Sequence, residues 1–82
     1  MLFVEVQVPI FDQVYDFKVE QNERVYKVLL DIIRKICQKE GFYIEEKQEK
    51  LFLWDMEQKR ILPKDWTMEE CGIKTGTKLL LV

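Results

Sequence analysis

Two runs near the start of the chain alternate between apolar and other side chains. Residues 2–8 are apolar at every even position, and residues 15–20 alternate again. A period of two is typical of strands with one buried face. Pro9 ends the first run because proline has no backbone N–H to donate to a sheet. The intervening segment at residues 10–13 is short, so the pattern predicts a hairpin.

A helical pattern follows this hairpin. From about Glu23 to Lys39, apolar residues recur at spacings of three and four, which places them on one face of a helix. Asn22 is the expected N-cap, and Gly41 lies where a left-handed residue would end the helix. The apolar face comprises Val25, Val28, Leu29, Ile32, Ile33 and Ile36.

The second half of the chain predicts short strands joined by turns. Residues 45–50 form a charged connection, and strands are expected over 51–54, around 60–62 and over 78–82. Thr67 and Glu70 have the spacing of a capping box and predict one helical turn closed by Gly72. The order predicts a single α+β domain over residues 1–82. A mixed sheet of four to five strands would pack on one main helix, with the first and last strands at its centre.

Composition narrows the classes of function. Lys and Arg number 13 against 15 Asp and Glu, a net charge of −2 over 82 residues. This balance argues against nucleic-acid binding and against a polybasic membrane-surface protein. The N-terminal residues lack the pattern of a signal peptide, and no apolar run is long enough for membrane insertion. Two cysteines without paired spacing fit a reducing cytoplasm.

Candidate chemistry is sparse. The chain contains no histidine, which removes the commonest general base and metal ligand. It also lacks a glycine-rich phosphate loop, metal-ligand spacing and a nucleophile motif. We therefore expect no enzyme activity, no catalytic residue, no cofactor and no metal. Cys37 and Cys71 are expected to be structural, because nothing beside them in sequence suggests a lowered pKa.

The C-terminal third resembles the ubiquitin superfamily, and the resemblance spans essentially the whole chain. It is carried by Leu62, the run 67–73, Leu79 and Leu81, together with the helix end at 39–41. Within the superfamily the chain resembles the YukD/EsaB proteins, in its length near 80 residues and in Cys71-Gly72-Ile73 followed by Gly76. This resemblance implies a β-grasp fold and an accessory role in type VII secretion of Gram-positive bacteria.

The chain departs from ubiquitin at its end, since the last predicted strand runs to Val82 and no Gly-Gly tail follows it. The resemblance therefore implies a non-conjugated adaptor or regulator that binds another protein, such as a secretion-system component. The alternatives are a modifier or sulfur-carrier relative with a lost tail, and a structural homo-oligomer, for example a homodimer. The connection 41–51 and the hairpin after Trp54 are also longer than in ubiquitin.

Strand alternation predicts one candidate surface. If Leu79 and Leu81 face the core, Leu80 and Val82 face outward, and Phe52 does so between inward Leu51 and Leu53. In ubiquitin the corresponding outward positions form the apolar patch that most partners recognise. The predicted protein-binding residues are Phe52, Leu80, Val82, Ile10 and Phe11. The alternative is that these are ordinary surface apolar residues and that Phe52 packs under the hairpin.

A second candidate surface lies on the helix. Tyr26, Leu30 and Cys37 widen its apolar face, although a segment at 42–44 that folds back over them is the favoured interpretation. Trp54 and Trp66 are either interface anchors or caps of the sheet ends, and the sequence does not separate these alternatives.

Overall fold

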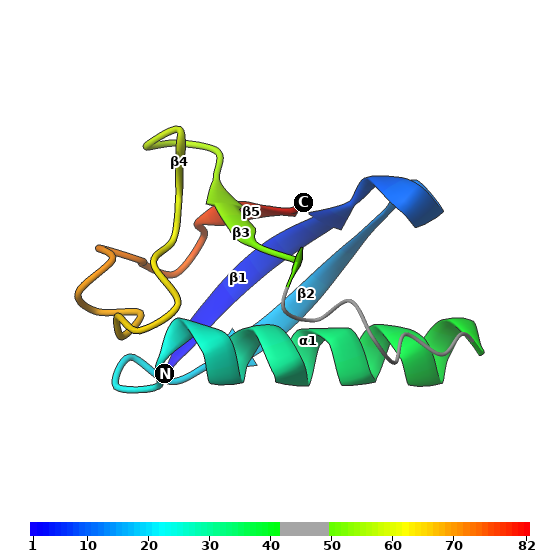
Figure 1. The fold of residues 1–82 in the computed structure, drawn as a ribbon, viewed down its shortest axis with the longest axis horizontal. Helices are drawn as coiled ribbons and strands as arrows, with labels where there is room; N and C mark the ends of the chain where they lie inside the picture. The colour runs from blue at the N-terminus through cyan, green and yellow to red at the C-terminus, as the bar shows by residue number, and fades with distance from the viewer. Residues whose placement is uncertain (42–49) are drawn as a thin grey trace.

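The computed structural model describes residues 1–41 and 50–82. The chain forms β1 (Leu2–Val8), a 3-10 turn η1 (Pro9–Phe11), β2 (Gln13–Val19), α1 (Val25–Glu40), β3 (Leu53–Asp55), β4 (Arg60–Ile61) and β5 (Lys78–Leu81). The five strands form one sheet in the order β2-β1-β5-β3-β4. The β1–β5 pair is parallel and the other pairs are antiparallel. Figure 1 shows α1 as a second layer lying along one face of this sheet.

The core lies between α1 and that face. The six residues of the predicted helical stripe are all buried, and β1 buries its even positions. The end strands of the sequence, β1 and β5, pair inside the sheet, as the pattern predicted. The α+β architecture, with a mixed sheet on one main helix, is confirmed.

The first hairpin begins its second strand earlier than predicted. β2 starts at Gln13, two residues before Tyr15. Pro9–Phe11 makes one 3-10 turn, and the Asp12 N–H donates to the Pro9 carbonyl oxygen at 3.0 Å. Asp12 has φ +51°, a left-handed conformation that aspartate tolerates better than most residues. The tight turn therefore leaves more residues for the strand.

The helix begins at Val25, and Asn22 is not its N-cap. The N-cap is Arg24, which makes no side-chain capping bond. The N–H of Val25 donates instead to the Trp66 carbonyl oxygen at 2.8 Å, and that of Tyr26 to the Lys64 carbonyl oxygen at 3.0 Å. A distant loop thus satisfies the free amides of the first turn. At the other end, Gly41 has φ +67° and closes the helix as predicted.

The predicted capping box forms, but on a turn too short to be a helix. The Thr67 N–H donates to Glu70 Oε1 at 2.9 Å, and the Glu70 N–H donates to Thr67 Oγ1 at 3.1 Å. The Cys71 N–H reaches the Thr67 carbonyl oxygen at 3.1 Å. Gly72, with φ +74°, closes the turn.

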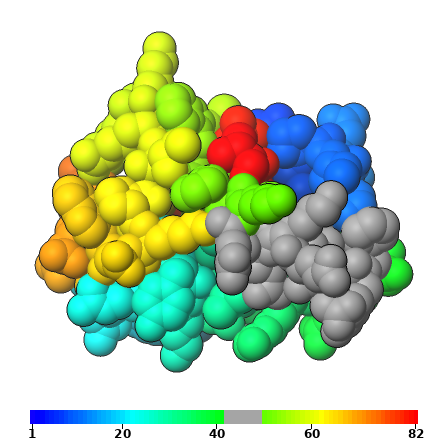
Figure 2. Space-filling view, viewed as in Figure 1, coloured from blue at the N-terminus to red at the C-terminus, as the bar shows by residue number. Residues whose placement is uncertain are grey.

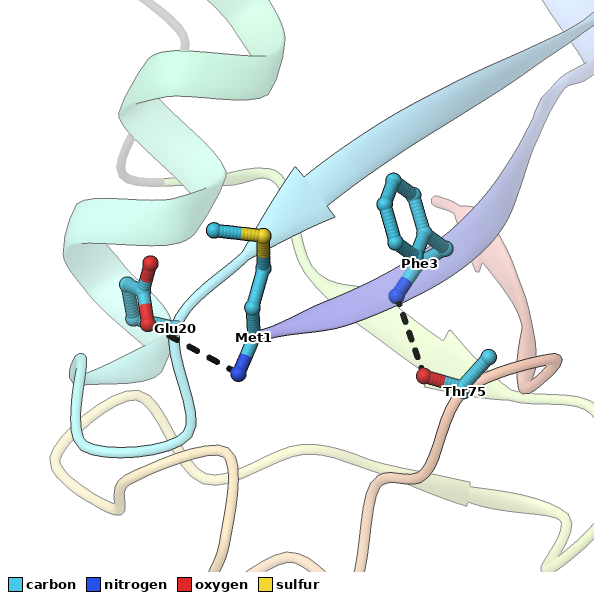
Figure 3. A network of polar contacts seen from close by, with 4 residues as sticks. All are labelled: Met1, Phe3, Glu20 and Thr75. Atoms are coloured by element: carbon cyan, nitrogen blue, oxygen red, sulfur yellow. Dashed lines mark hydrogen bonds and ion pairs between the residues drawn. The ribbon is translucent and has the colours of Figure 1, made fainter.

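The start of β1 is held on both sides (Figure 3). The Met1 amino group lies 3.8 Å from Glu20 Oε2, just after β2. The Phe3 N–H donates to Thr75 Oγ1 at 3.3 Å, in the turn before β5. The first strand is therefore fixed to both of its neighbours in the sheet.

Candidate protein-binding surface on the open face of the sheet

The face of the sheet opposite α1 has an apolar centre. Leu53 and Leu79 point into the core and are fully buried. Because strand side chains alternate, Trp54 and Leu80 project from the other face. The β3–β5 register places Trp54 directly opposite Leu80. The two side chains are half-buried and are cross-strand neighbours.

This pair belongs to a row that crosses all five strands. Trp54 also lies opposite Ile61 on β4, and Leu80 lies beside Gln7 on β1, which faces Val14 on β2. Ile61 is 47% exposed and Val14 57%. We call these five residues the open-face row; four of them are apolar.

Phe52 and Val82 extend the same face beyond the row. The Phe52 N–H donates to the Val82 carbonyl oxygen at 2.8 Å, and the Val82 N–H donates to the Phe52 carbonyl oxygen at 2.9 Å. They are therefore paired and project to one side, as Trp54 and Leu80 do. Val82 is 46% exposed. Phe52 is half-buried, with the Lys64 ammonium 4.2 Å from its ring centroid, a cation–π distance.

The first turn borders this surface. Figure 2 shows the C-terminal residues (red) at the surface between the N-terminal hairpin (blue) and the segment around β3 (green). Ile10 is 78% exposed at the tip of that hairpin. Phe11 is half-buried and packs against the core. Of the five predicted residues, Phe52, Leu80 and Val82 thus share one face, while Ile10 and Phe11 lie in the adjoining turn.

Of the four apolar members of the row, sequence reasoning assigned only Leu80 to this surface. It left Trp54 as either an interface anchor or a cap of a sheet end, and it missed Ile61 and Val14. Trp54 follows from the same alternation that placed Phe52 outward, because Leu53 lies between them. Ile61 precedes the buried Leu62 in the same way. Val14 precedes the predicted start of the second strand, so no alternation signal was available for it.

A buried carboxylate fixes the hairpin that carries Trp54 and Ile61. Asp55 is 1% exposed. Its Oδ1 accepts the N–H of Glu57 at 2.9 Å and of Gln58 at 3.2 Å, and its Oδ2 accepts Gln58 Nε2 at 2.8 Å. The Cys71 carbonyl oxygen accepts Gln58 Nε2 at 3.1 Å and Arg60 Nη2 at 2.9 Å. The network ties the β3–β4 hairpin to the 67–72 turn.

The helix surface is less coherent than the open face. Tyr26 is 48% exposed, and Leu30 and Cys37 are half-buried. The segment 42–44, which was expected to cover them, lies outside the described residues. Trp66 is 42% exposed beside the start of α1.

Cys71 is buried, and burial raises the pKa of its thiol. A raised pKa disfavours the thiolate, so the structural interpretation fits this cysteine.

Within residues 1–41 and 50–82, no three His, Cys, Asp or Glu side chains form a group that could hold a metal ion. In that same part of the chain, no helix has the length and apolar character needed to cross a membrane.

Solved structures place this arrangement in a known fold. A de novo design based on ubiquitin matches with a TM-score of 0.71 and 18% identity, over 99% of this chain and 85% of the design. The chain has a ubiquitin-like fold. A chain in a crystal structure of ATBAG1 in complex with HSP70 also matches, with a TM-score of 0.71 and 10% identity. This chain is fully covered by that match but spans only 40% of the neighbour's length.

The sequence gives no closer relationship. No protein-family model matches it, and no curated protein matches it significantly. The assignment of a ubiquitin-like fold therefore depends on three-dimensional similarity alone. The open-face row is the feature of the structure from which we infer a function.

Proposed function

We propose that the chain is an adaptor that binds a partner protein non-covalently through the open face of its ubiquitin-like sheet. The observation that carries this proposal is the pairing of Trp54 with Leu80 at the centre of that face, where Trp54 also lies opposite the exposed Ile61. Contiguous exposed apolar side chains on small domains often mark interaction sites. A tryptophan at the centre of such a patch is a common energetic anchor.

The partner that we propose is a cytoplasmic component of a type VII secretion machine. The motivation is the resemblance to YukD/EsaB proteins in Cys71-Gly72-Ile73 and Gly76. The structure gives these positions a role in folding, because Gly72 and Gly76 have φ +74° and +93° and Ile73 is buried. The proposed role in secretion therefore rests on the resemblance, and the proposed mode of binding rests on the open face.

Binding measurements on matched variants test the surface. The chain would be titrated against purified cytoplasmic domains of the secretion ATPase by calorimetry. We expect Leu80→Asp and Trp54→Ala each to weaken binding by about 10-fold or more, because both remove the centre of the patch. Tyr26→Asp is the control, since it places the same charge at an exposed position on α1. It should leave the affinity within about 2-fold.

Four outcomes would change the proposal. Unchanged affinity for Leu80→Asp would exclude the open face, and a loss confined to Tyr26→Asp would move the site to the helix. No binding by the wild-type chain would exclude this partner. Incubation with a ubiquitin-type activating enzyme and ATP should give no thioester, and a conjugate would overturn the non-covalent mechanism.

A further inference from the structure

The free edge of the sheet is a second surface that is able to bind another chain. β2 is the edge strand beyond β1, on the side away from β5 (Figure 1). It runs for seven residues. An edge strand presents unpaired backbone groups that can bind a further strand.

The hydrogen bonds identify which residues direct their backbone groups outward. The Glu5 N–H donates to the Thr77 carbonyl oxygen, and the Phe3 carbonyl oxygen accepts the Gly76 N–H. These residues of β1 therefore direct their backbone groups toward β5, and Val4 and Val6 direct theirs toward β2. The β2 partners of Val4 and Val6 are Phe17 and Tyr15. It follows that the intervening residues Val14, Asp16 and Lys18 direct their N–H and C=O groups to the free edge.

Two of these residues, Asp16 and Lys18, carry charges. Asp16 lies opposite Glu5, and Lys18 lies opposite Phe3. Two carboxylates directly opposite each other on a sheet are destabilising. Neither Asp16 nor Lys18 has an ion-pair partner among the residues that the structure describes. A positive charge on the outer side of Asp16 would offset the Glu5 carboxylate.

We infer that a second copy of this chain pairs antiparallel along β2, in the register that places Phe17 opposite Phe17 of the second copy. This register sets Asp16 opposite Lys18 of the second copy, and two-fold symmetry repeats the contact. The paired residues are those with outward backbone groups, so each ion pair accompanies a pair of backbone hydrogen bonds. The two sheets become one, with both open-face rows on the same side.

The neighbouring registers are less favourable. Centring the pair on Asp16 sets two aspartates opposite each other beside the two Glu5 carboxylates. Centring it on Tyr15 sets Asp16 opposite Val14. Centring it on Val19 needs Glu20, which follows β2 and whose carboxylate faces the Met1 amino group (Figure 3). Only the Phe17 register pairs opposite charges from two residues that both lie within β2.

The edge is held in place by the end of α1. The Tyr15 hydroxyl donates to Glu40 Oε2 at 2.8 Å, and the Lys39 ammonium lies 5.2 Å from the Tyr15 ring centroid. The Lys35 ammonium lies 5.7 Å from the Phe17 ring centroid. Lys35 would approach its counterpart near the two-fold axis, but its exposed side chain can extend into solvent.

Charge reversal tests the register directly. Sedimentation equilibrium of the full chain should show a dimer with a dissociation constant on the order of 100 µM, because the interface is small. Asp16→Lys and Lys18→Asp should each weaken the dimer by about 10-fold, since each replaces two attractions with two repulsions. An equimolar mixture of these two variants should associate, and the double variant D16K/K18D should recover wild-type association within about 3-fold.

Leu80→Asp is the control, because Leu80 lies on β5, away from the β2 edge. The inferred dimer does not depend on the proposed function, so the two can fail separately. It should leave the dimer unchanged, and circular dichroism of every variant should show the wild-type fold. A wild-type chain that stays monomeric up to about 1 mM would overturn the inference. So would a dimer that is insensitive to charge reversal, or one abolished by Leu80→Asp, because either result places the interface elsewhere.

Discussion

Replacing Asp55 with alanine should destabilise the domain more than its position in a surface hairpin suggests. The carboxylate is almost fully buried and accepts three hydrogen bonds within four residues of chain. Asp55→Ala removes all three and leaves the Gln58 amide without one of its two acceptors. The hairpin keeps the backbone bond from the Lys59 N–H to the Asp55 carbonyl oxygen at 2.7 Å, but it loses the side-chain bonds that fix its turn.

The magnitude follows from these bonds. A hydrogen bond to a charged group contributes about 1.5–3 kcal/mol. Two of the donors are backbone N–H groups of the exposed residues Glu57 and Gln58, which water can reach after the substitution. Removing the carboxylate also relieves its desolvation cost. We therefore expect a net loss of about 2–3 kcal/mol, against a total stability of roughly 4–12 kcal/mol for a domain of this size.

Two milder substitutions should reduce the free energy of unfolding by less, and they serve as comparisons for Asp55→Ala. Asp55→Asn keeps one acceptor oxygen, and Gln58 can turn its amide to meet the new NH₂ group while Arg60 still binds the Cys71 carbonyl. We expect this variant and Gln58→Ala each to lose about 1 kcal/mol. The assay is urea unfolding followed by tryptophan fluorescence. A loss below about 0.5 kcal/mol for Asp55→Ala, or equal losses for the alanine and asparagine variants, would refute this reasoning.

Two further predictions concern the turns. Lys59 has φ +56°, a left-handed conformation that strains a residue with a side chain. Lys59→Gly should therefore raise the free energy of unfolding by about 0.5 kcal/mol in the same urea assay. The strain that glycine relieves in the folded state is larger than the conformational entropy that it adds to the unfolded chain. The Thr67 N–H that Glu70 accepts holds the pKa of the Glu70 carboxyl below its ordinary value of 4.5. This contribution is complete above pH 4.5 and is lost as the pH falls through the lower, folded-state pKa. Unfolding measured from about pH 3 to 6 should show Glu70→Gln losing less stability on acidification than the wild-type chain.

The parts of the fold that were predicted correctly depend on local periodicity. The α1 stripe from Val25 to Ile36 repeats at helical spacing, and each of its six members is buried. Gly41 and Gly72 were expected at turns that need a positive φ, and both have one. Such features depend on a few neighbouring residues, so the sequence alone is sufficient to indicate them.

Predictions were wrong where residues far away in the sequence make the hydrogen bonds that were expected from a neighbouring residue. Asn22 was the natural N-cap by residue type, yet the carbonyl groups of Lys64 and Trp66 satisfy the amides at the start of α1. These residues are about forty positions away, and no pattern near Asn22 indicates them. The burial of Asp55 was also not predicted, because nothing in the sequence identifies the hydrogen-bond donors that surround its carboxylate.

The candidate site was also predictable only in part: alternation predicts which face a side chain lies on, but not which side chains are its neighbours. Alternation alone assigns Leu80 and Phe52 to the outward face, and the structure places both there. It does not reveal that Trp54 lies opposite Leu80, since this depends on how β3 pairs with β5 across more than twenty residues. The same pairing, continued through Gln7 and Ile61, converts scattered apolar residues into one row. A surface built across five strands is a property of their register, and a substitution that shifts that register would disperse the row even if every residue in it were kept.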